Sequence, residues 1–113
     1  MRAAPPGPTA VTGASGRLGR AVLARLRALD RPAIAWSRPD YDLDEPGAAA
    51  RLLARDAPSL VIHCAAWTDV DGCARDPDTA MRRNARAVRE LAEAAAAAGA
   101  RLVVVSTNEV FDG

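Results

Sequence analysis

The chain has 113 residues, half of them hydrophobic, and a formal net charge of +1, so it can build one small core but lacks the positive charge typical of nucleic-acid-binding domains. No apolar run reaches the ~18 residues of a membrane helix, and we expect residues 1–8, with three prolines and no apolar stretch, to be a disordered tail rather than a signal peptide. We therefore expect no nucleic-acid or membrane partner, and the two cysteines, Cys64 and Cys73, fit a reduced cytoplasmic protein.

A glycine-rich turn between a predicted strand and a predicted helix is the most informative feature. The strand is predicted over Thr9–Val11, the helix over Arg17–Leu29, and the turn between them has G-x-x-G-x-x-G spacing. Such a turn holds a dinucleotide pyrophosphate, because its glycines allow a tight turn, a close approach to the phosphates and close helix packing, while the helix start offers free N–H groups. The flanking elements favour this over an ordinary turn. We expect cofactor contacts from Gly13, Ser15, Gly16, Arg17, Leu18 and Gly19.

The remaining predicted elements alternate in the same way. Strands are predicted at Ala33–Trp36, Leu60–Cys64 and Arg101–Ser106, and helices at Gly47–Ala54 and Thr79–Ala98. The first helix is expected to bury one face made of Leu18, Val22, Leu26 and Leu29.

This alternation indicates an α/β fold with a Rossmann-type, doubly wound parallel sheet in strand order 3-2-1-4. The apolar fourth strand would leave a sheet edge open, which soluble proteins avoid. We therefore expect residues 9–113 to be the N-terminal part of an NAD(P)-binding Rossmann domain, with the rest of that domain and a substrate domain absent.

Four sequence blocks carry a resemblance to a known family. They are Thr12–Gly19, Tyr41–Pro46, Val61–Asp71 and Val105–Gly113, in the family's order and at family-like spacing. The chain resembles the dTDP-4-dehydrorhamnose reductase branch of the extended short-chain dehydrogenase/reductases. The resemblance implies a Rossmann domain with a smaller C-terminal substrate domain. It also implies transfer of hydride from NAD(P)H to the 4-keto group of a deoxysugar nucleotide, and it allows a homodimer of the full-length parent.

The resemblance also assigns a catalytic set. The family uses a Ser or Thr with a Tyr-x-x-x-Lys pair, and Thr107 matches the hydroxyl position; alternatively, Ser106 and Thr107 only satisfy backbone groups in the turn after the strand. The chain has no lysine, and Tyr41 lies near the second predicted strand, so the pair is expected beyond Gly113. We expect this chain alone to bind cofactor weakly and to be inactive.

The end of the second predicted strand bears on the choice of cofactor. An NAD site places an acidic residue there, whereas this strand is followed by Arg38, which could pair with the 2′-phosphate of NADP(H) with help from Arg17. NADP(H) is favoured, and NAD(H) is the alternative if both arginines are instead solvated surface residues. Asp42 and Leu43 match the family's adenine contacts, although Asp42 could instead cap a turn before Pro46.

The segment after the third predicted strand matches the family's contacts to the nicotinamide ribose and pyrophosphate, through Ala65, Ala66, Trp67 and Thr68. His63 replaces the family's usual Asn and is interpreted as a core histidine. Asn84 is expected to brace the third and fourth strands. His63, Cys64 and Cys73 match no zinc-finger spacing, so no metal is expected.

Asn108 and Glu109 are the clearest departure from the family, whose better-known reductases carry Asp-Tyr beside the sugar. They are the candidate contacts to the nucleotide-sugar substrate, and they leave rhamnose synthesis itself open. The alternatives are a nucleotide-sugar epimerase or dehydratase with tightly held NAD, a non-catalytic dinucleotide-binding regulatory subunit, and a truncated product without a function of its own.

Overall fold

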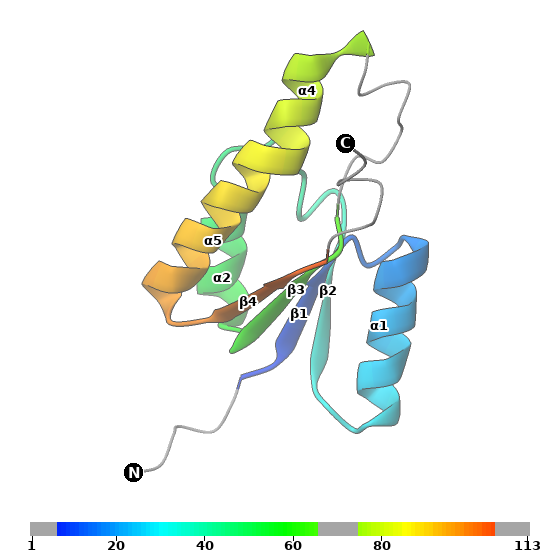
Figure 1. Ribbon diagram of the computed structural model, residues 1–113. Coiled ribbons are helices and arrows are strands. Elements are labelled where there is room, and N and C mark those ends of the chain that lie inside the picture. The colour runs from blue at the N-terminus through cyan, green and yellow to red at the C-terminus, as the bar shows by residue number, and fades with distance from the viewer. Residues whose placement is uncertain (1–6, 66–74, 106–113) are drawn as a thin grey trace.

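The computed structural model describes residues 7–65 and 75–105, and it contains one four-stranded parallel sheet between two layers of helices (Figure 1). Helix α1 covers one face, while α2 and the α4–α5 helix cover the other. The α/β, doubly wound class expected from the sequence is confirmed. The elements are β1 (Thr9–Thr12), α1 (Arg17–Ala28), β2 (Ala33–Trp36), α2 (Ala48–Asp56), β3 (Leu60–His63), α4 (Pro77–Met81), the π-helical turn η1 (Arg82–Arg86), α5 (Ala87–Ala98) and β4 (Arg101–Val104).

The strand order is β2-β1-β3-β4, which differs from the expected 3-2-1-4. Thr9 of β1 pairs with Ala33 of β2 on one side and with Leu60 of β3 on the other. In the doubly wound pattern the third strand lies outside the second, but here residues 37–47 form no strand before α2 begins. The next strand in the chain, β3, therefore pairs with β1 on the side opposite β2.

Helix α1 buries a face one position away from the expected one. Leu18 and Leu29 are about half exposed, whereas Gly19 and Leu23 are buried and Val22 and Leu26 pack beside them. The cause is the close approach of Gly19 to the β1 turn, which rotates the helix toward the Gly19–Leu23 line. Leucine spacing alone did not reveal this, because glycine adds nothing to an apolar pattern.

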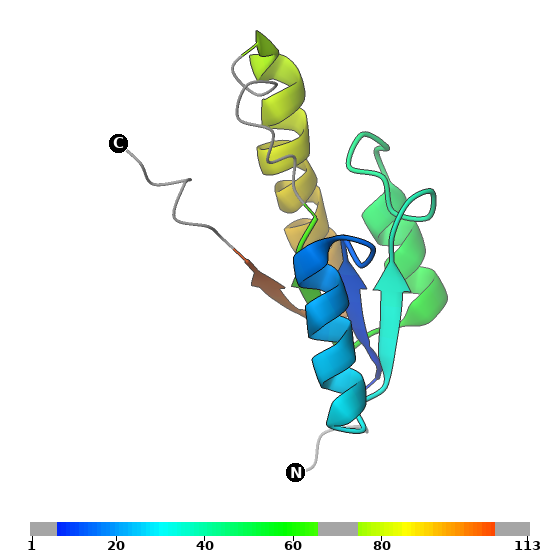
Figure 2. The ribbon, with the colours of Figure 1, turned by 90° about the vertical axis from the view of Figure 1, so that its right-hand side faces the viewer.

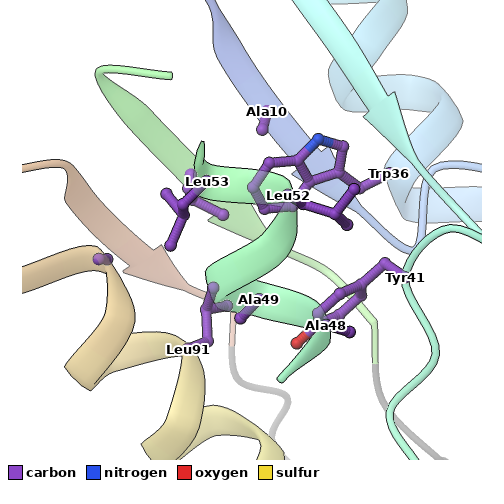
Figure 3. Packing of buried hydrophobic residues seen from close by; sticks show 10 residues of the cluster. Ala10, Trp36, Tyr41, Ala48, Ala49, Leu52, Leu53 and Leu91 are labelled. Atoms are coloured by element: carbon purple, nitrogen blue, oxygen red, sulfur yellow. The ribbon is translucent and has the colours of Figure 1, made fainter. Parts of the chain in front are cut away.

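The main core fills the space between the sheet and the α2–α5 layer. Figure 3 shows Trp36 from β2, Leu52 and Leu53 from α2 and Leu91 from α5 turned toward one another. The Trp36 indole N–H donates to Asp56 Oδ2 at 2.8 Å, so its one polar atom is satisfied at the rim of this core. The core holds β2 and α2 together and thereby anchors both ends of the loop that connects them.

Strand β4 is the edge of the described sheet (Figure 2). Val103 and Val104 are nearly half exposed, as expected for an apolar edge left open. The single helix predicted over Thr79–Ala98 begins at Pro77 in the structure and consists of α4, η1 and α5 in direct succession, with π-helical hydrogen bonding in η1. Within residues 7–65 and 75–105, no helix is long and apolar enough to span a membrane.

Candidate functional site

A hollow of about 300 Å³ lies at the carboxyl ends of β1, β2 and β3. Ligand sites in open parallel sheets are found at this end, where the connections from two neighbouring strands diverge to opposite faces. Here β1 leads into α1 on one face, and β3 leads toward the opposite layer. The lining consists of Gly13, Ser15, Gly16, Ser37, Arg38, Tyr41, Asp42, Leu43, Asp44, Cys64, Ala65 and Arg83.

The structure brings seven of the predicted site residues into this lining, namely Gly13, Ser15, Gly16, Arg38, Asp42, Leu43 and Ala65. Arg17, Leu18 and Gly19 form the first turn of α1 and are not in the lining; Gly19 is buried behind it, while Arg17 and Leu18 are exposed. The predicted residues Ala66, Trp67, Thr68, Thr107, Asn108 and Glu109 lie outside the described residues.

The three glycines of the turn differ in whether the fold requires a glycine at their position. Gly13 has φ +62°, and a Cβ there would lie 2.8 Å from Ala65 N and Cα, so conformation and space both require glycine. A Cβ on Gly19 would overlap the carbonyl of Gly13. Gly16 has an ordinary extended conformation, and a Cβ there would meet only Gly13 O at 3.4 Å. Gly16 is therefore the one glycine of the turn that the fold itself does not need.

One hydroxyl group of β1 holds the pocket-lining residues that follow β3. The backbone N–H groups of Cys64 and Ala65 both donate to Thr12 Oγ1, at 2.9 and 3.0 Å, and His63 Nδ1 lies 2.8 Å from the same oxygen. Thr12 and His63 are almost completely buried. The start of the segment after β3 is thus held against the glycine turn.

Two buried rings, Tyr41 in the pocket lining and His63 behind it, pack against each other. Tyr41 is edge-on to His63, with 6.1 Å between ring centroids and an interplanar angle of 87°. Burial raises the pKa of Tyr41 to about 12, with a smaller contribution from the Glu90 carboxylate, and burial lowers the pKa of His63 to about 4. Both rings are therefore uncharged at neutral pH, so the interpretation of His63 as a core histidine agrees with its environment.

The opposite wall carries a charged clamp. Arg83 donates to both carboxylate oxygens of Asp44, at 2.9 and 2.8 Å, and Arg82 donates to Oδ1 at 3.1 Å. The hydrogen bond from Arg83 is the largest cause that lowers the pKa of Asp44 to about 2. The clamp joins the loop after β2 to η1, which also contains Asn84.

Asp42 stabilises a turn in the structure, and only one of its two carboxylate oxygens takes part. Its Oδ1 accepts from Asp44 N at 2.9 Å, and its carbonyl accepts from Glu45 N. Arg38 sits at the carboxyl end of β2 with an exposed side chain, in the pocket lining beside Ser37. The pocket lining therefore includes the exposed guanidinium-bearing Arg38 and Gly16, the residue that precedes α1.

Sequence reasoning missed Ser37, Tyr41, Asp44, Cys64 and Arg83 as lining residues. The first four flank residues that were singled out, so the carboxyl ends of the strands were a usable signal. Arg83 had none, because its place depends on the packing of η1 against the loop after β2. In the part of the chain that the structure describes, no group of three or more His, Cys, Asp and Glu side chains could hold a metal ion.

Comparisons with known proteins agree with this architecture. The family model described as RmlD substrate binding domain matches residues 9–113. Over 103 residues, 91% of the chain, it is 41% identical to dTDP-4-dehydrorhamnose reductase from Mycobacterium tuberculosis, and over 110 residues it is 36% identical to methionine adenosyltransferase 2 subunit beta from Rattus norvegicus, again with 91% of the chain covered. Each match spans 33% of the relative, so the chain spans about a third of the length of these curated relatives.

A solved structure supports the same comparison at the level of the fold. The crystal structure of dTDP-4-dehydrorhamnose reductase from Bacillus anthracis, in complex with NADP, superposes with a TM-score of 0.86 at 30% sequence identity. That alignment covers 99% of this chain and 40% of the reductase chain.

Proposed function

The chain belongs to the RmlD substrate binding domain family, and from that premise we propose that its pocket holds the nicotinamide dinucleotide of a sugar-nucleotide reductase. The observation that carries the proposal is the glycine turn that opens α1 at the base of the pocket. The reaction is reduction of a 4-keto deoxysugar nucleotide, with NADP(H) as the preferred cofactor. Residues 9–113 contribute the cofactor-binding part of a longer protein.

The described residues suit a pyrophosphate. Gly13 and Gly16 line the pocket with backbone alone, so neither places a side chain between the turn and a ligand. The first turn of α1 contains no acidic residue, so its free N–H groups and partial positive charge are available to an anion. Asp42 and Leu43 would hold the adenine, and Ala65 to Thr68 the nicotinamide side.

Preference for NADP(H) is supported by the end of β2. Trp36 is followed by Ser37 and Arg38 in the pocket lining, where an NAD site would place a carboxylate. An exposed guanidinium suits the extra phosphate of NADP(H), because it can bond two phosphate oxygens at once. The similar reductase from Bacillus anthracis was crystallised with NADP.

The bound cofactor would supply hydride to the 4-keto carbon. Thr107 would hydrogen-bond the developing alkoxide, and Asn108 with Glu109 would contact the sugar. The sequence contains no lysine, so a Tyr-x-x-x-Lys pair is not among these 113 residues. We therefore propose that turnover requires the longer parent chain.

Cofactor titration tests this proposal. NADPH and NADH are titrated into the protein while reduced-nicotinamide fluorescence is followed, for the unchanged chain, for R38Q and for R31Q. NADPH should bind at least ~10-fold more tightly than NADH, and R38Q should remove most of this difference, because one charged hydrogen-bonding partner contributes about that much. R31Q is the matched control, since Arg31 is exposed beyond the last turn of α1, outside the pocket lining.

Two results would count against the proposal. Equal binding of NADPH and NADH, unchanged in R38Q, would remove the assigned cofactor preference. Failure of both dinucleotides to bind the longer parent protein in its folded form would remove the dinucleotide site itself.

A regulatory subunit is the second candidate function. It is favoured by the 36% identity to methionine adenosyltransferase 2 subunit beta and by the altered pair Asn108-Glu109. The two candidates separate in an assay of the longer parent with NADPH and a dTDP-4-keto-6-deoxysugar. Oxidation of NADPH supports the reductase, whereas dinucleotide binding without turnover supports the regulatory role.

A further inference from the structure

Three polar atoms converge on the hydroxyl oxygen of Thr12. The backbone N–H groups of Cys64 and Ala65 donate to it at 2.9 and 3.0 Å, and His63 Nδ1 lies 2.8 Å away. A hydroxyl group has two lone pairs and one proton. Because the two N–H groups occupy both lone pairs, the proton of Thr12 must point toward His63 Nδ1.

This arrangement defines the protonation of the imidazole. If Nδ1 carried a proton, a third donor would face an oxygen whose lone pairs are already occupied. His63 is therefore neutral, with its proton on Nε2. Burial supports the neutral form, since the side chain is 2% exposed and its pKa is lowered to about 4. Within the described residues, Nε2 is buried without a hydrogen-bond partner, so the ring gains its one hydrogen bond at Nδ1.

The hydroxyl of Thr12 acts directly on the wall of the pocket. Cys64 and Ala65 are lining residues, and Ala65 packs so closely on Gly13 that a methyl group on Gly13 would not fit. A rotation of the hydroxyl would release one of the two N–H groups and allow this segment to shift relative to the glycine turn. The orientation of this O–H bond thus bears on how Cys64 and Ala65 are held beside the glycine turn.

We propose that His63 is a positioning residue of the dinucleotide pocket: by accepting the Thr12 proton at Nδ1, it turns both lone pairs of that oxygen toward the N–H groups of Cys64 and Ala65. The identity of the ligand rests on the proposed function, but the hydrogen-bond arrangement does not. His63 touches neither cofactor nor substrate in this role. It acts through Thr12 alone.

The protonation pattern can be observed directly. His63 is the single histidine of the chain, so its two ring nitrogens give one unambiguous pair of nitrogen-15 signals. In the purified protein at pH 7, Nε2 should show a bonded proton and Nδ1 should show none. A proton on Nδ1, or rapid exchange between the two forms, would overturn the proposal.

Three substitutions of His63 test whether the position of the acceptor atom, rather than the volume of the side chain, is what matters. H63N keeps an acceptor oxygen the same number of bonds from the backbone as Nδ1, H63Q moves the amide to the place of Nε2, and H63L has no acceptor. Amide hydrogen exchange at Cys64 and Ala65 should remain slow in H63N and become at least ~10-fold faster in H63Q and H63L. NADPH affinity should follow the same order.

The outcomes distinguish this proposal from the proposed function. Slow exchange at Cys64 and Ala65 in a folded H63Q or H63L protein would refute the positioning role, whether or not a dinucleotide binds. If H63L fails to fold, substitutions of Thr12 give the same comparison. The amides of Cys64 and Ala65 should exchange slowly in T12S, which keeps the hydroxyl group, and rapidly in T12V, which lacks it. If the nitrogen-15 pattern and the order of exchange rates are as expected but NADPH does not bind, the proposed ligand is wrong and the positioning role of His63 still holds.

Discussion

Gly16 differs from its two neighbouring glycines in what a methyl group would meet. Its φ of −80° suits any residue, and its nearest clash partner is Gly13 O at 3.4 Å. We expect G16A to change the free energy of unfolding by no more than about 1 kcal/mol, because alanine is only moderately worse than glycine at a helix N-cap. Because Gly16 lines the pocket, we expect a methyl group there to crowd the bound pyrophosphate, so NADPH should bind at least ~10-fold more weakly, measured by fluorescence titration beside urea unfolding.

Gly19 and Gly47 give the matched controls for that experiment. A methyl group on Gly19 would overlap the backbone of Gly13 and Ala14, so G19A should cost about 3 kcal/mol of folding free energy. Gly47 has φ +84° with open space around it, so G47A should cost only about 1 kcal/mol and leave NADPH affinity unchanged. A G16A protein that binds NADPH normally would contradict the phosphate role of the turn.

At the scale of elements, the Asp44 clamp joins the loop after β2 to the α4–α5 helix. Arg83 binds the Asp44 carboxylate through two hydrogen bonds and Arg82 adds a third. The Asp44 side chain is 34% exposed, so solvent screens the pair and we expect D44N to lower the free energy of unfolding by about 1 kcal/mol. The measurement is urea unfolding at pH 7, where the carboxylate is ionised because its pKa is about 2.

Salt and a control variant identify the cause of that loss. The difference between D44N and the unchanged chain should shrink in 1 M NaCl, because salt screens partly exposed ion pairs. E93Q removes an exposed carboxylate from α5 and should leave stability unchanged. A D44N loss that persists in high salt would show that packing, rather than charge, makes the clamp stabilising.

The elements themselves were predictable wherever local chemistry decides them. Ala33–Trp36 was predicted to the residue, because an apolar run after Pro32 is a strong local signal. The strand order was not, because it depends on the segment after β2 forming a loop instead of a strand. The π-helical turn at Arg82–Arg86 was also missed, since those residues favour an ordinary helix and no local pattern marks the change.

At the scale of the whole molecule, the pocket residues also fall into those that local sequence signals predict and those that they do not. The glycine turn and Arg38 could be predicted, because each lies beside a strand end and carries its own chemical signal. Arg83 and the Thr12–His63 contact could not, because the latter joins residues 51 positions apart and exists only once β1 and β3 pair. Contacts between distant elements therefore supplied the parts of the site that sequence alone left out.

Burial of the His63 ring makes the stability of the whole molecule sensitive to acid. The pKa of His63 is about 4 in the folded chain, against an ordinary value of 6.5. The unfolded chain therefore binds a proton below pH 6.5 while the folded chain does not, so stability is full above pH 6.5 and falls as the pH approaches 4. The total loss is about 3 kcal/mol. Hydrogen bonds lower the pKa values of the Asp44, Asp56 and Asp76 carboxyls, so these groups also contribute less stability as the pH falls toward 4, and they do so equally in a variant that lacks His63.

Urea unfolding followed by far-UV circular dichroism between pH 4.5 and 7.5 checks this expectation against H63N. The free energy of unfolding of the unchanged chain should fall by about 1.4 kcal/mol per pH unit once the pH is below 6.5. H63N has no group that titrates at this position, so its curve should be flatter over the same range. Parallel curves would mean that His63 does not set the acid response. Because H63N keeps an acceptor for Thr12, a flatter curve with unchanged stability at pH 7.5 would separate the cost of burying an imidazole from the role of its Nδ1 atom.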